Sequence, residues 1–218
     1  MGRIEIDLFT TLDLVAQAPG APEEDLEGGF TFGGWQAPFP DDVVGEQIQA
    51  GIAAMDALLL GRKTYDIFAG YWPLQEDDFA GGIAGNLNRV PKYVASRSKL
   101  NLGWAGSSQI GTDIATAVRD IRDRHENVHV IGSLDFVQTL LTERLFDRLN
   151  LFVYPIVLGS GKKVFGSGTV PSNLTLAEPA ISTAAGAVLL HYQLADGVPR
   201  TGDMSKHARG LDSAESPV

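Results

Sequence analysis

The chain contains no cysteine among its 218 residues. This absence excludes disulfide bonds, thiolate zinc sites and a cysteine nucleophile. Four histidines remain as candidate metal ligands, and two of them, His125 and His129, are four residues apart. Because Glu126 and Asn127 between them are typical of a turn rather than of one helical face, we expect no metal site there.

Long apolar runs and an excess of positive charge are also absent. No stretch approaches the roughly 20 apolar residues that a membrane-spanning helix needs. Glu5 and Asp7 interrupt the first residues, which is not typical of a signal peptide, so we expect a cytoplasmic protein with no membrane partner. The formal net charge of −10 repels nucleic-acid phosphates, and no nucleic-acid partner is expected. A phosphorylated small ligand is still compatible with this charge, because a few local cations can dominate one pocket.

Two common nucleotide-binding signatures are missing as well. The segment Gly159–Lys163 reads Gly-Ser-Gly-Lys-Lys, which lacks the first glycine of the P-loop and the Ser or Thr after its lysine. No G-x-G-x-x-G motif follows an early strand. The sequence therefore indicates neither a nucleoside triphosphatase nor the usual dinucleotide-binding fold.

What the chain does contain is an alternation of short apolar runs and helical stripes. This order predicts one α/β domain over residues 1–196, with a mainly parallel central sheet and antiparallel pairing at its C-terminal end. Residues 10–40 form a long loop, which is usually functional in a compact domain, and residues 197–218 are predicted to be a disordered tail. Strands are predicted over residues 4–9, 57–60, 92–96, 127–131 and 148–158 and in a hairpin of 174–183 with 187–195; helices are predicted from residue 42, over 113–124 and from 134.

Three strand ends carry candidate phosphate-binding loops. In Leu60–Thr64 a glycine permits a turn, two cations follow, and Thr64 is placed to cap a helix. Ser96–Ser98 combines a guanidinium with two hydroxyls, which suits a phosphate monoester. Ile131–Ser133 leads into a helix N-terminus, which attracts a pyrophosphate. By itself the first loop is more often an exposed turn, the second carries little information and the third is an ordinary helix cap, but in a parallel sheet all three lie along the edge where ligands bind.

These loops carry a family resemblance. Leu58–Tyr65, Val94–Ser98 and Val130–Ser133 resemble the three cofactor loops of dihydrofolate reductases. The run Phe146–Phe165 resembles the C-terminal reductase domain of bifunctional riboflavin-biosynthesis deaminase/reductases and its stand-alone relatives. The resemblance implies a dihydrofolate-reductase-like three-layer fold, NADPH as the cofactor, and a homodimer.

The resemblance also implies which residues bind NADPH. The first loop would bind the adenosine and phosphate part, the second the 2′-phosphate, and the third the pyrophosphate. Relatives often have glycine where this chain has Leu134. The implied cofactor-binding residues are Gly61, Arg62, Lys63, Thr64, Ser96, Arg97, Ser98, Ile131, Gly132, Ser133 and Leu134.

Candidate substrate residues come from two further segments. Thr10–Leu14 resembles the family's Ser-Leu-Asp-Gly turn, with Leu14 in place of the glycine. The stretch from Trp35 to Asp41 resembles the part of dihydrofolate reductases in which a helix-borne carboxylate helps to protonate the pterin. An acid beside a tryptophan in an apolar pocket would have a raised pKa, so Asp41 is the candidate catalytic acid; its alternative role is to cap the helix that follows. The candidate substrate-binding residues are Asp13, Trp35, Tyr71, Trp72 and Gly159, with a turn-forming role open for Asp13 and Gly159 and a core role open for Tyr71 and Trp72.

The function implied is the NADPH-dependent reduction of a small heterocyclic or ribosylamino-pyrimidine-like substrate, as in a 5-amino-6-(5-phosphoribosylamino)uracil reductase. The residues of this sequence show neither a deaminase domain nor the zinc signature of a deaminase. Two alternatives remain open. A true dihydrofolate reductase is disfavoured because Asp41 is displaced by one residue, and a non-catalytic NADPH-binding or sensor protein is favoured by Leu14 and Leu134.

Overall fold

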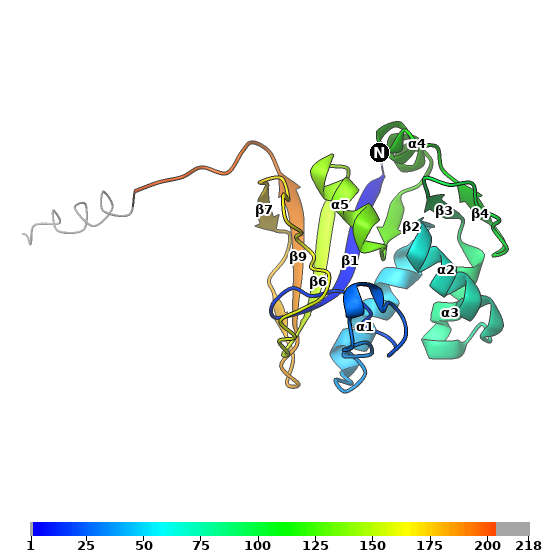
Figure 1. Ribbon diagram of the computed structural model, residues 1–218, viewed down its shortest axis with the longest axis horizontal. Helices are drawn as coiled ribbons and strands as arrows, with labels where there is room; N and C mark the ends of the chain where they lie inside the picture. Colours follow the sequence, from blue (N-terminus) through cyan, green and yellow to red (C-terminus); the bar gives the residue numbers. More distant parts are fainter. Residues whose placement is uncertain (1, 204–218) are drawn as a thin grey trace, which may run out of the picture.

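The computed structural model describes residues 2–203, which form one nine-stranded sheet with helices on both faces (Figure 1). The strand order is β4-β3-β2-β5-β1-β6-β9-β7, and β8 also pairs with β9. The strands are β1 (Arg3–Thr11), β2 (Ala57–Gly61), β3 (Lys92–Ala95), β4 (Ser107–Gln109), β5 (Asn127–Val130), β6 (Arg148–Tyr154), β7 (Asn173–Leu176), β8 (Ile181–Ser182) and β9 (Val188–Ala195). The helices are η1 (Glu27–Gly29), α1 (Asp42–Ala54), α2 (Arg62–Tyr71), η2 (Trp72–Leu74), α3 (Phe79–Arg89), α4 (Ile114–Arg124) and α5 (Leu134–Thr142).

The pairing changes from parallel to antiparallel along the sheet. From β4 through β6 all neighbours are parallel, whereas β9 is antiparallel to β6, β7 and β8. This confirms the predicted α/β class with antiparallel pairing at the C-terminal end. The parallel part brings the carboxyl ends of β3, β2 and β5 side by side, which is where the three predicted cofactor loops begin.

Strand β1 shows how the sheet is covered on its two faces. Its residues alternate, so that Ile6 and Leu8 face one side and Asp7 and Phe9 face the other. The first side packs against α4 and α5 in the main hydrophobic core, and Figure 1 shows α5 lying across the sheet. On the other side, Phe9 packs in a second cluster that includes Val44 of α1. The polar residue Asp7 therefore points to the α1 side of the sheet.

Two predicted strands were too long. The strand predicted over residues 148–158 ends at Tyr154, because Pro155 has no N–H to donate and the N–H of Ile156 turns back to the Tyr154 carbonyl at 2.8 Å. The predicted strand 174–183 is interrupted, and β7 and the two-residue β8 are separated by a segment that contains Pro179. Both pieces still pair with β9, so the closing antiparallel arrangement is retained.

Some elements were misplaced or missed. Helix α2 begins at Arg62 with Gly61 as its N-cap, so the prediction that Thr64 caps a helix is wrong. Helix α3 was not predicted, and its start is irregular in the structure, since Ala80, Gly81 and Gly82 have positive φ angles. The short edge strand β4 was also missed.

The C-terminal tail was predicted to begin at residue 197. Residues 197–203 form neither helix nor strand, and the rest of the predicted tail lies outside the described residues. Within the described part of the chain, no helix is both long enough and apolar enough to cross a membrane.

Candidate active site

A cavity of about 590 Å³ opens at the carboxyl edge of the parallel sheet. This size is typical of a pocket for a small molecule or part of a cofactor. Its wall combines the middle of β1, the long loop, the start of α2 and the link between β5 and α5. The lining segments are residues 7–9, 16–20, 23–26, 63–64 and 131–135, joined by Gln36, Asp66, Ile67, Phe68, Trp72 and Lys162.

The first and third predicted cofactor loops are in direct contact at this edge. The N–H of Gly61 donates to the carbonyl of Gly132 at 2.9 Å. A Cβ at Gly61 would lie only 2.8 Å from the Ser133 nitrogen, so the glycine is required by this close approach rather than by a turn. Gly132 has a φ of +136°, a conformation that favours glycine, and its peptide bond with Ser133 is cis. The two loops therefore form one continuous surface of the cavity.

The structure separates the predicted cofactor-binding residues into two groups. Lys63, Thr64 and the whole segment 131–134 line the cavity, and this segment includes Leu134. Gly61 and Arg62 do not line it. Arg62 instead lies on the surface and forms an ion pair with Asp66 at 3.2 Å.

The second predicted cofactor loop lies beside the first but outside the cavity. Strands β2 and β3 are in register with Gly61 opposite Ala95, which places the following residues next to the start of α2. The hydroxyl of Ser96 accepts a hydrogen bond from the Ser98 N–H at 3.2 Å and forms a small turn. Arg97 within this turn is exposed, so its guanidinium is accessible to a ligand that extends beyond the cavity.

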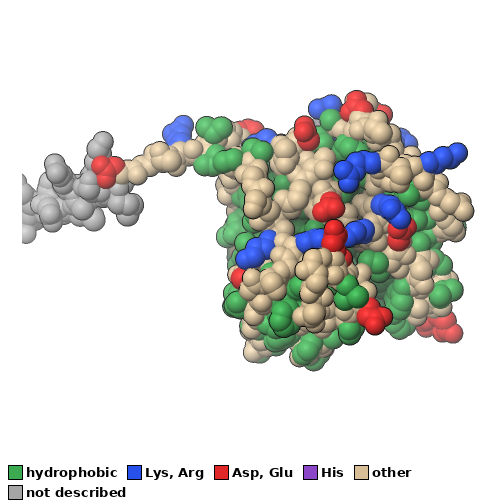
Figure 2. Space-filling model, viewed as in Figure 1, with side chains coloured by type: hydrophobic (Ala, Val, Ile, Leu, Met, Phe, Trp, Pro, Cys, Tyr) green, Lys and Arg blue, Asp and Glu red, His purple; other side chains and the backbone are tan. Residues whose placement is uncertain are grey.

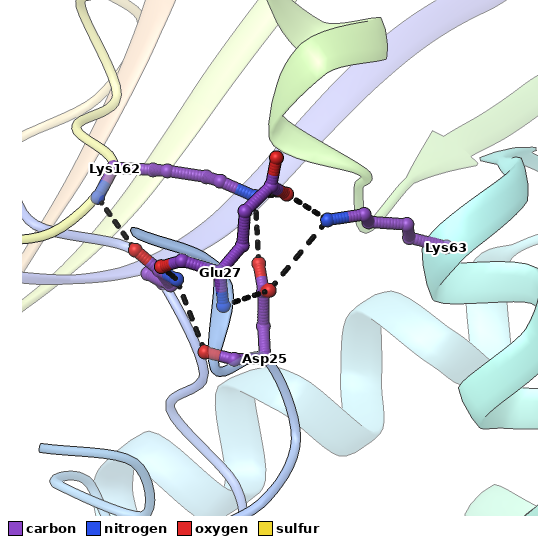
Figure 3. Close-up of polar contacts among 5 residues, drawn as sticks. Asp25, Glu27, Lys63 and Lys162 are labelled. Atoms are coloured by element: carbon purple, nitrogen blue, oxygen red, sulfur yellow. Dashed lines mark hydrogen bonds and ion pairs between the residues drawn. The ribbon is translucent and has the colours of Figure 1, made fainter. Parts of the chain in front are cut away.

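An ion-pair cluster joins the long loop to the cavity wall (Figure 3). Lys162 donates to Asp25 at 2.8 Å and to Glu27 at 2.7 Å. Lys63 bonds to Glu27 as well and lies 3.6 Å from Asp25. The side chain of Gln17 supports the loop by donating to the carbonyls of Asp25 and Glu27, each at 3.0 Å. Acidic and basic side chains are accordingly intermingled on this face of the molecule (Figure 2).

The hydrogen bonds within this cluster change the pKa values of Glu27 and Lys162. Hydrogen bonds from Lys162 and Lys63 lower the pKa of Glu27 to about 2. Burial lowers the pKa of Lys162, but hydrogen bonds to Asp25 and Glu27 outweigh this and raise it above its ordinary value. Lys162 is therefore charged, and both lysines that line the cavity, Lys63 and Lys162, are already bonded to carboxylates.

Asp41 does not lie in this cavity. It is the N-cap of α1, where its carboxylate accepts a hydrogen bond from the Val44 N–H at 3.1 Å, and it lines a separate, smaller cavity of about 280 Å³. Hydrogen bonds from the Thr183 side chain and the Val44 N–H lower its pKa. The expectation of a raised pKa is wrong, because these donors stabilise the charged form. The structure favours the alternative in which Asp41 caps the helix.

The predicted aromatic substrate residues are placed differently from one another. Trp35 is buried, donates its indole N–H to the Gln17 carbonyl at 2.8 Å and packs against Tyr154, and it lines neither cavity. Trp72 lines the main cavity. Tyr71 is 45% exposed and contacts the edge of Trp72 without lining either cavity. Only Trp72 is therefore brought to the site.

Asp13 and Gly159 belong to one turn contact rather than to the cavity. The Asp13 carboxylate accepts hydrogen bonds from the Gly159 N–H at 2.9 Å, the Leu158 N–H at 3.2 Å and the Thr11 hydroxyl at 2.7 Å. Burial raises the pKa of Asp13, but these hydrogen bonds outweigh it and lower the pKa overall. Leu14 next to it has a φ of +65°, a left-handed conformation that favours glycine.

Sequence reasoning missed a polar group on the floor of the cavity. Asp7 lines the cavity, and its carboxylate contacts His129 Nδ1 at 2.6 Å and accepts from Asn150 at 2.8 Å. Asn150 also donates to the buried Glu5 at 3.1 Å. The available signal was the pair of acids at alternate positions of β1, a strand that is otherwise largely apolar. Their partners on β5 and β6 follow only from the strand order.

Comparison with known proteins identifies relatives. Residues 3–188 match the RibD C-terminal domain. An uncharacterized protein of Bacillus subtilis (strain 168), YyaP, is 27% identical over 113 residues, which cover 51% of this chain and 60% of that protein.

Solved structures share the fold. A putative riboflavin biosynthesis protein from Shewanella sp. PV-4 superposes with a TM-score of 0.67 at 18% identity, covering 89% of this chain and 99% of that one. A pyrimidine reductase-like protein from Corynebacterium diphtheriae gives 0.62 at 13% identity, covering 90% and 93%. RibD of Acinetobacter baumannii gives 0.58 at 12% identity; 90% of this chain matches 59% of that longer protein.

Proposed function

Since the chain belongs to the RibD C-terminal domain family, we propose that it is an NADPH-dependent reductase of a small heterocyclic substrate. The observation that carries the proposal is the cavity at the carboxyl edge, where parts of two of the three predicted cofactor loops line the wall together with Asp7, which is bonded to the buried His129. The family supports a reductase of the riboflavin-pathway type. The use of NADPH as the cofactor and a small heterocycle as the substrate are our proposals.

The residues around the cavity fit a nicotinamide dinucleotide phosphate. Segment 131–134 at the N-terminus of α5 is suited to the pyrophosphate, because the first N–H groups of a helix attract anions. Ser96–Ser98 is suited to the 2′-phosphate, because Arg97 is exposed beside two hydroxyls. When bound, the cofactor supplies the hydride, and the protein supplies orientation and exclusion of water.

The charges of the cavity favour an uncharged substrate over a phosphorylated one. Both lysines on its wall, Lys63 and Lys162, are bonded to Asp25 and Glu27. A substrate phosphate would have to displace these carboxylates before it reached either lysine. The acidic residues that line the cavity are Asp7, Glu23, Glu24, Asp25, Asp66 and Asp135.

A fluorescence titration of the whole chain with NADPH and with NADH tests the cofactor proposal. The variant Arg97→Gln should bind NADPH about tenfold more weakly and NADH unchanged, because one charge-assisted contact to the 2′-phosphate is worth roughly 1.4 kcal/mol. Arg119→Gln, an exposed arginine on α4, is the matched control and should bind both cofactors like the wild type. Failure of the wild type to bind NADPH at high micromolar concentration would overturn the proposal.

Turnover is tested separately by following NADPH oxidation with a panel of carbonyl and imine heterocycles. Binding without consumption of NADPH would instead support the non-catalytic alternative.

The homodimer also stays a prediction, based on the commonness of twofold homodimers. Size-exclusion chromatography with light scattering tests it.

A further inference from the structure

Asp7 lies between the cavity and a buried histidine. Its side chain is 20% exposed and lines the cavity floor, whereas the side chain of His129 behind it is 7% exposed. The two are joined by the 2.6 Å contact between Asp7 Oδ2 and His129 Nδ1. The other carboxylate oxygen accepts from Asn150, so the orientation of the carboxylate is held from two neighbouring strands. An ionisable group inside the protein is thus connected to the cavity by one hydrogen bond.

The groups around His129 favour its charged form. Helix α1 covers the ring, since a Cβ on Gly51 would lie 3.8 Å from His129 Cε1. Burial lowers the pKa of His129, but the negative charge of Asp7, the hydrogen bond to it and the negative charge of Glu5 raise the pKa above its usual value, against a smaller lowering by Arg3. On β9, His191 contacts Asn150 at 2.9 Å and completes the same polar group.

Asp7 is bonded to a histidine, whereas other carboxylates of the cavity wall are bonded to groups of a different kind. Asp25 is bonded to lysines, Asp66 to Arg62, and Glu24 accepts from the backbone N–H groups of Gly20 and Ala21. A lysine, an arginine or a backbone amide does not readily release a proton near neutral pH. A histidine does, because its pKa lies in that range.

We propose that Asp7 and His129 deliver the proton that accompanies hydride transfer, with Asp7 as the catalytic residue that faces the substrate and His129 as the positioning residue that holds the proton. The inference rests on the proposed reductase function. A carbon of the substrate's C=N or C=O bond gains a hydride from the reduced nicotinamide, and the electron pair of that bond moves to the nitrogen or oxygen. That atom takes a proton from the Asp7 carboxyl group, which receives one from His129 Nδ1. The neutral imidazole then regains a proton from water.

The first test is an NMR titration of the histidine rings in the protein without ligand, so it does not depend on turnover. In the wild type, His129 should titrate above the usual value of 6.5. In Asp7→Asn it should titrate at lower pH, because the negative charge and the hydrogen bond of Asp7 raise the pKa of His129. An unchanged titration of His129 in Asp7→Asn would overturn the proposal.

The second test is the pH dependence of NADPH oxidation with a substrate that the wild type reduces. Asp7→Asn should lower kcat by about 100-fold with little change in KM, as expected for loss of a proton donor. His129→Gln should lower kcat by about tenfold and remove the fall of kcat at high pH. The control is His125→Gln, at a histidine whose ring lies 4.0 Å from Asp56 outside the cavity, and it should keep the wild-type profile.

The outcomes separate this proposal from the reductase proposal. Wild-type kcat and an unchanged pH profile in Asp7→Asn would overturn proton delivery and leave the reductase intact. Absence of turnover by the wild type on every substrate would overturn both, even if the NMR titration confirmed the charged pair. Loss of the high-pH limb in His129→Gln, with that limb retained in His125→Gln, would support the proposal, because a purely structural defect would not remove one limb of the profile.

Discussion

Gly61 and Ser133 approach each other so closely that a single methyl group would not fit between them. A Cβ on Gly61 would lie 2.8 Å from the Ser133 nitrogen and 2.9 Å from the Phe136 Cβ. These atoms belong to the end of β2 and the start of α5, which are more than 70 residues apart in the sequence. The contact joins the first and third predicted cofactor loops, so its disturbance should affect both stability and ligand binding.

We expect Gly61→Ala to lower the free energy of unfolding by about 1–3 kcal/mol, because the backbone of α5 has to move. The affinity for NADPH should fall as well. Gly70→Ala is the matched control, since Gly70 lies in α2 with open space around its Cβ position and alanine favours a helix. Denaturant unfolding and an NADPH titration of both variants check this; equal stability of Gly61→Ala and the wild type would contradict the close approach.

Glu27→Gln should increase the affinity for anionic ligands. The substitution removes one of the two carboxylates that neutralise Lys63 and Lys162. We expect the dissociation constant for NADPH to fall by about two- to fivefold, a change typical of one partly screened charge. Because the pKa of Glu27 is about 2, the effect should be the same throughout the neutral and mildly acidic range.

A titration at low and at high salt measures the effect of Glu27→Gln, and the gain should shrink at high salt. Glu178→Gln, at an exposed carboxylate near Arg148 on another part of the sheet, is the control. A gain of equal size in Glu178→Gln would show that net charge rather than the cluster is responsible.

The charged pair of Asp7 and His129 should make stability depend on pH. The pKa of His129 is raised in the folded protein, so the pair stabilises the fold fully below the unfolded value of 6.5 and this stabilisation is lost as the pH rises through the folded value. The difference in unfolding free energy between the wild type and Asp7→Asn should therefore be about 1–3 kcal/mol at mildly acidic pH and smaller at alkaline pH. Urea unfolding across this range measures it, and a difference that grows with pH would have the wrong sign.

Asp13 should be a stability residue rather than a substrate-binding residue. Asp13→Ala leaves the N–H groups of Leu158 and Gly159 without their acceptor and should lower the unfolding free energy by about 1–3 kcal/mol. Asp13→Asn keeps one acceptor oxygen and should lose less. Thermal unfolding and NADPH titration together test this, because a large loss of cofactor affinity in a variant of normal stability would assign Asp13 to the ligand site instead.

Much of the fold was accessible from local patterns. The apolar run at residues 57–60 and the stripe from Leu134 are local signals, and both became the elements expected of them. The failures were also local in origin. Pro155 ended a strand early, and α3, which was missed, has two adjacent glycines near its start, a residue type that is unfavourable in helices. The candidate site was only partly predictable. Segments 63–64 and 131–134 line the cavity, as expected of cofactor-binding residues. Asp41 was predicted to be a catalytic acid from its position near Trp35 in the sequence, but it is the N-cap of α1.

The sequence by itself determined the class of the fold and the three loops at the carboxyl edge, because both depend on periodicity and on residues adjacent in the chain. The tertiary structure alone decided which charges meet. His129 reaches Asp7 across 122 residues, and Glu27 reaches Lys162 across 135. Such contacts depend on strand order and on the path of the long loop, and a hydrogen bond forms only when both place its two atoms within about 3 Å. The pattern of a strand specifies which face a side chain takes, but not which strand lies beside it.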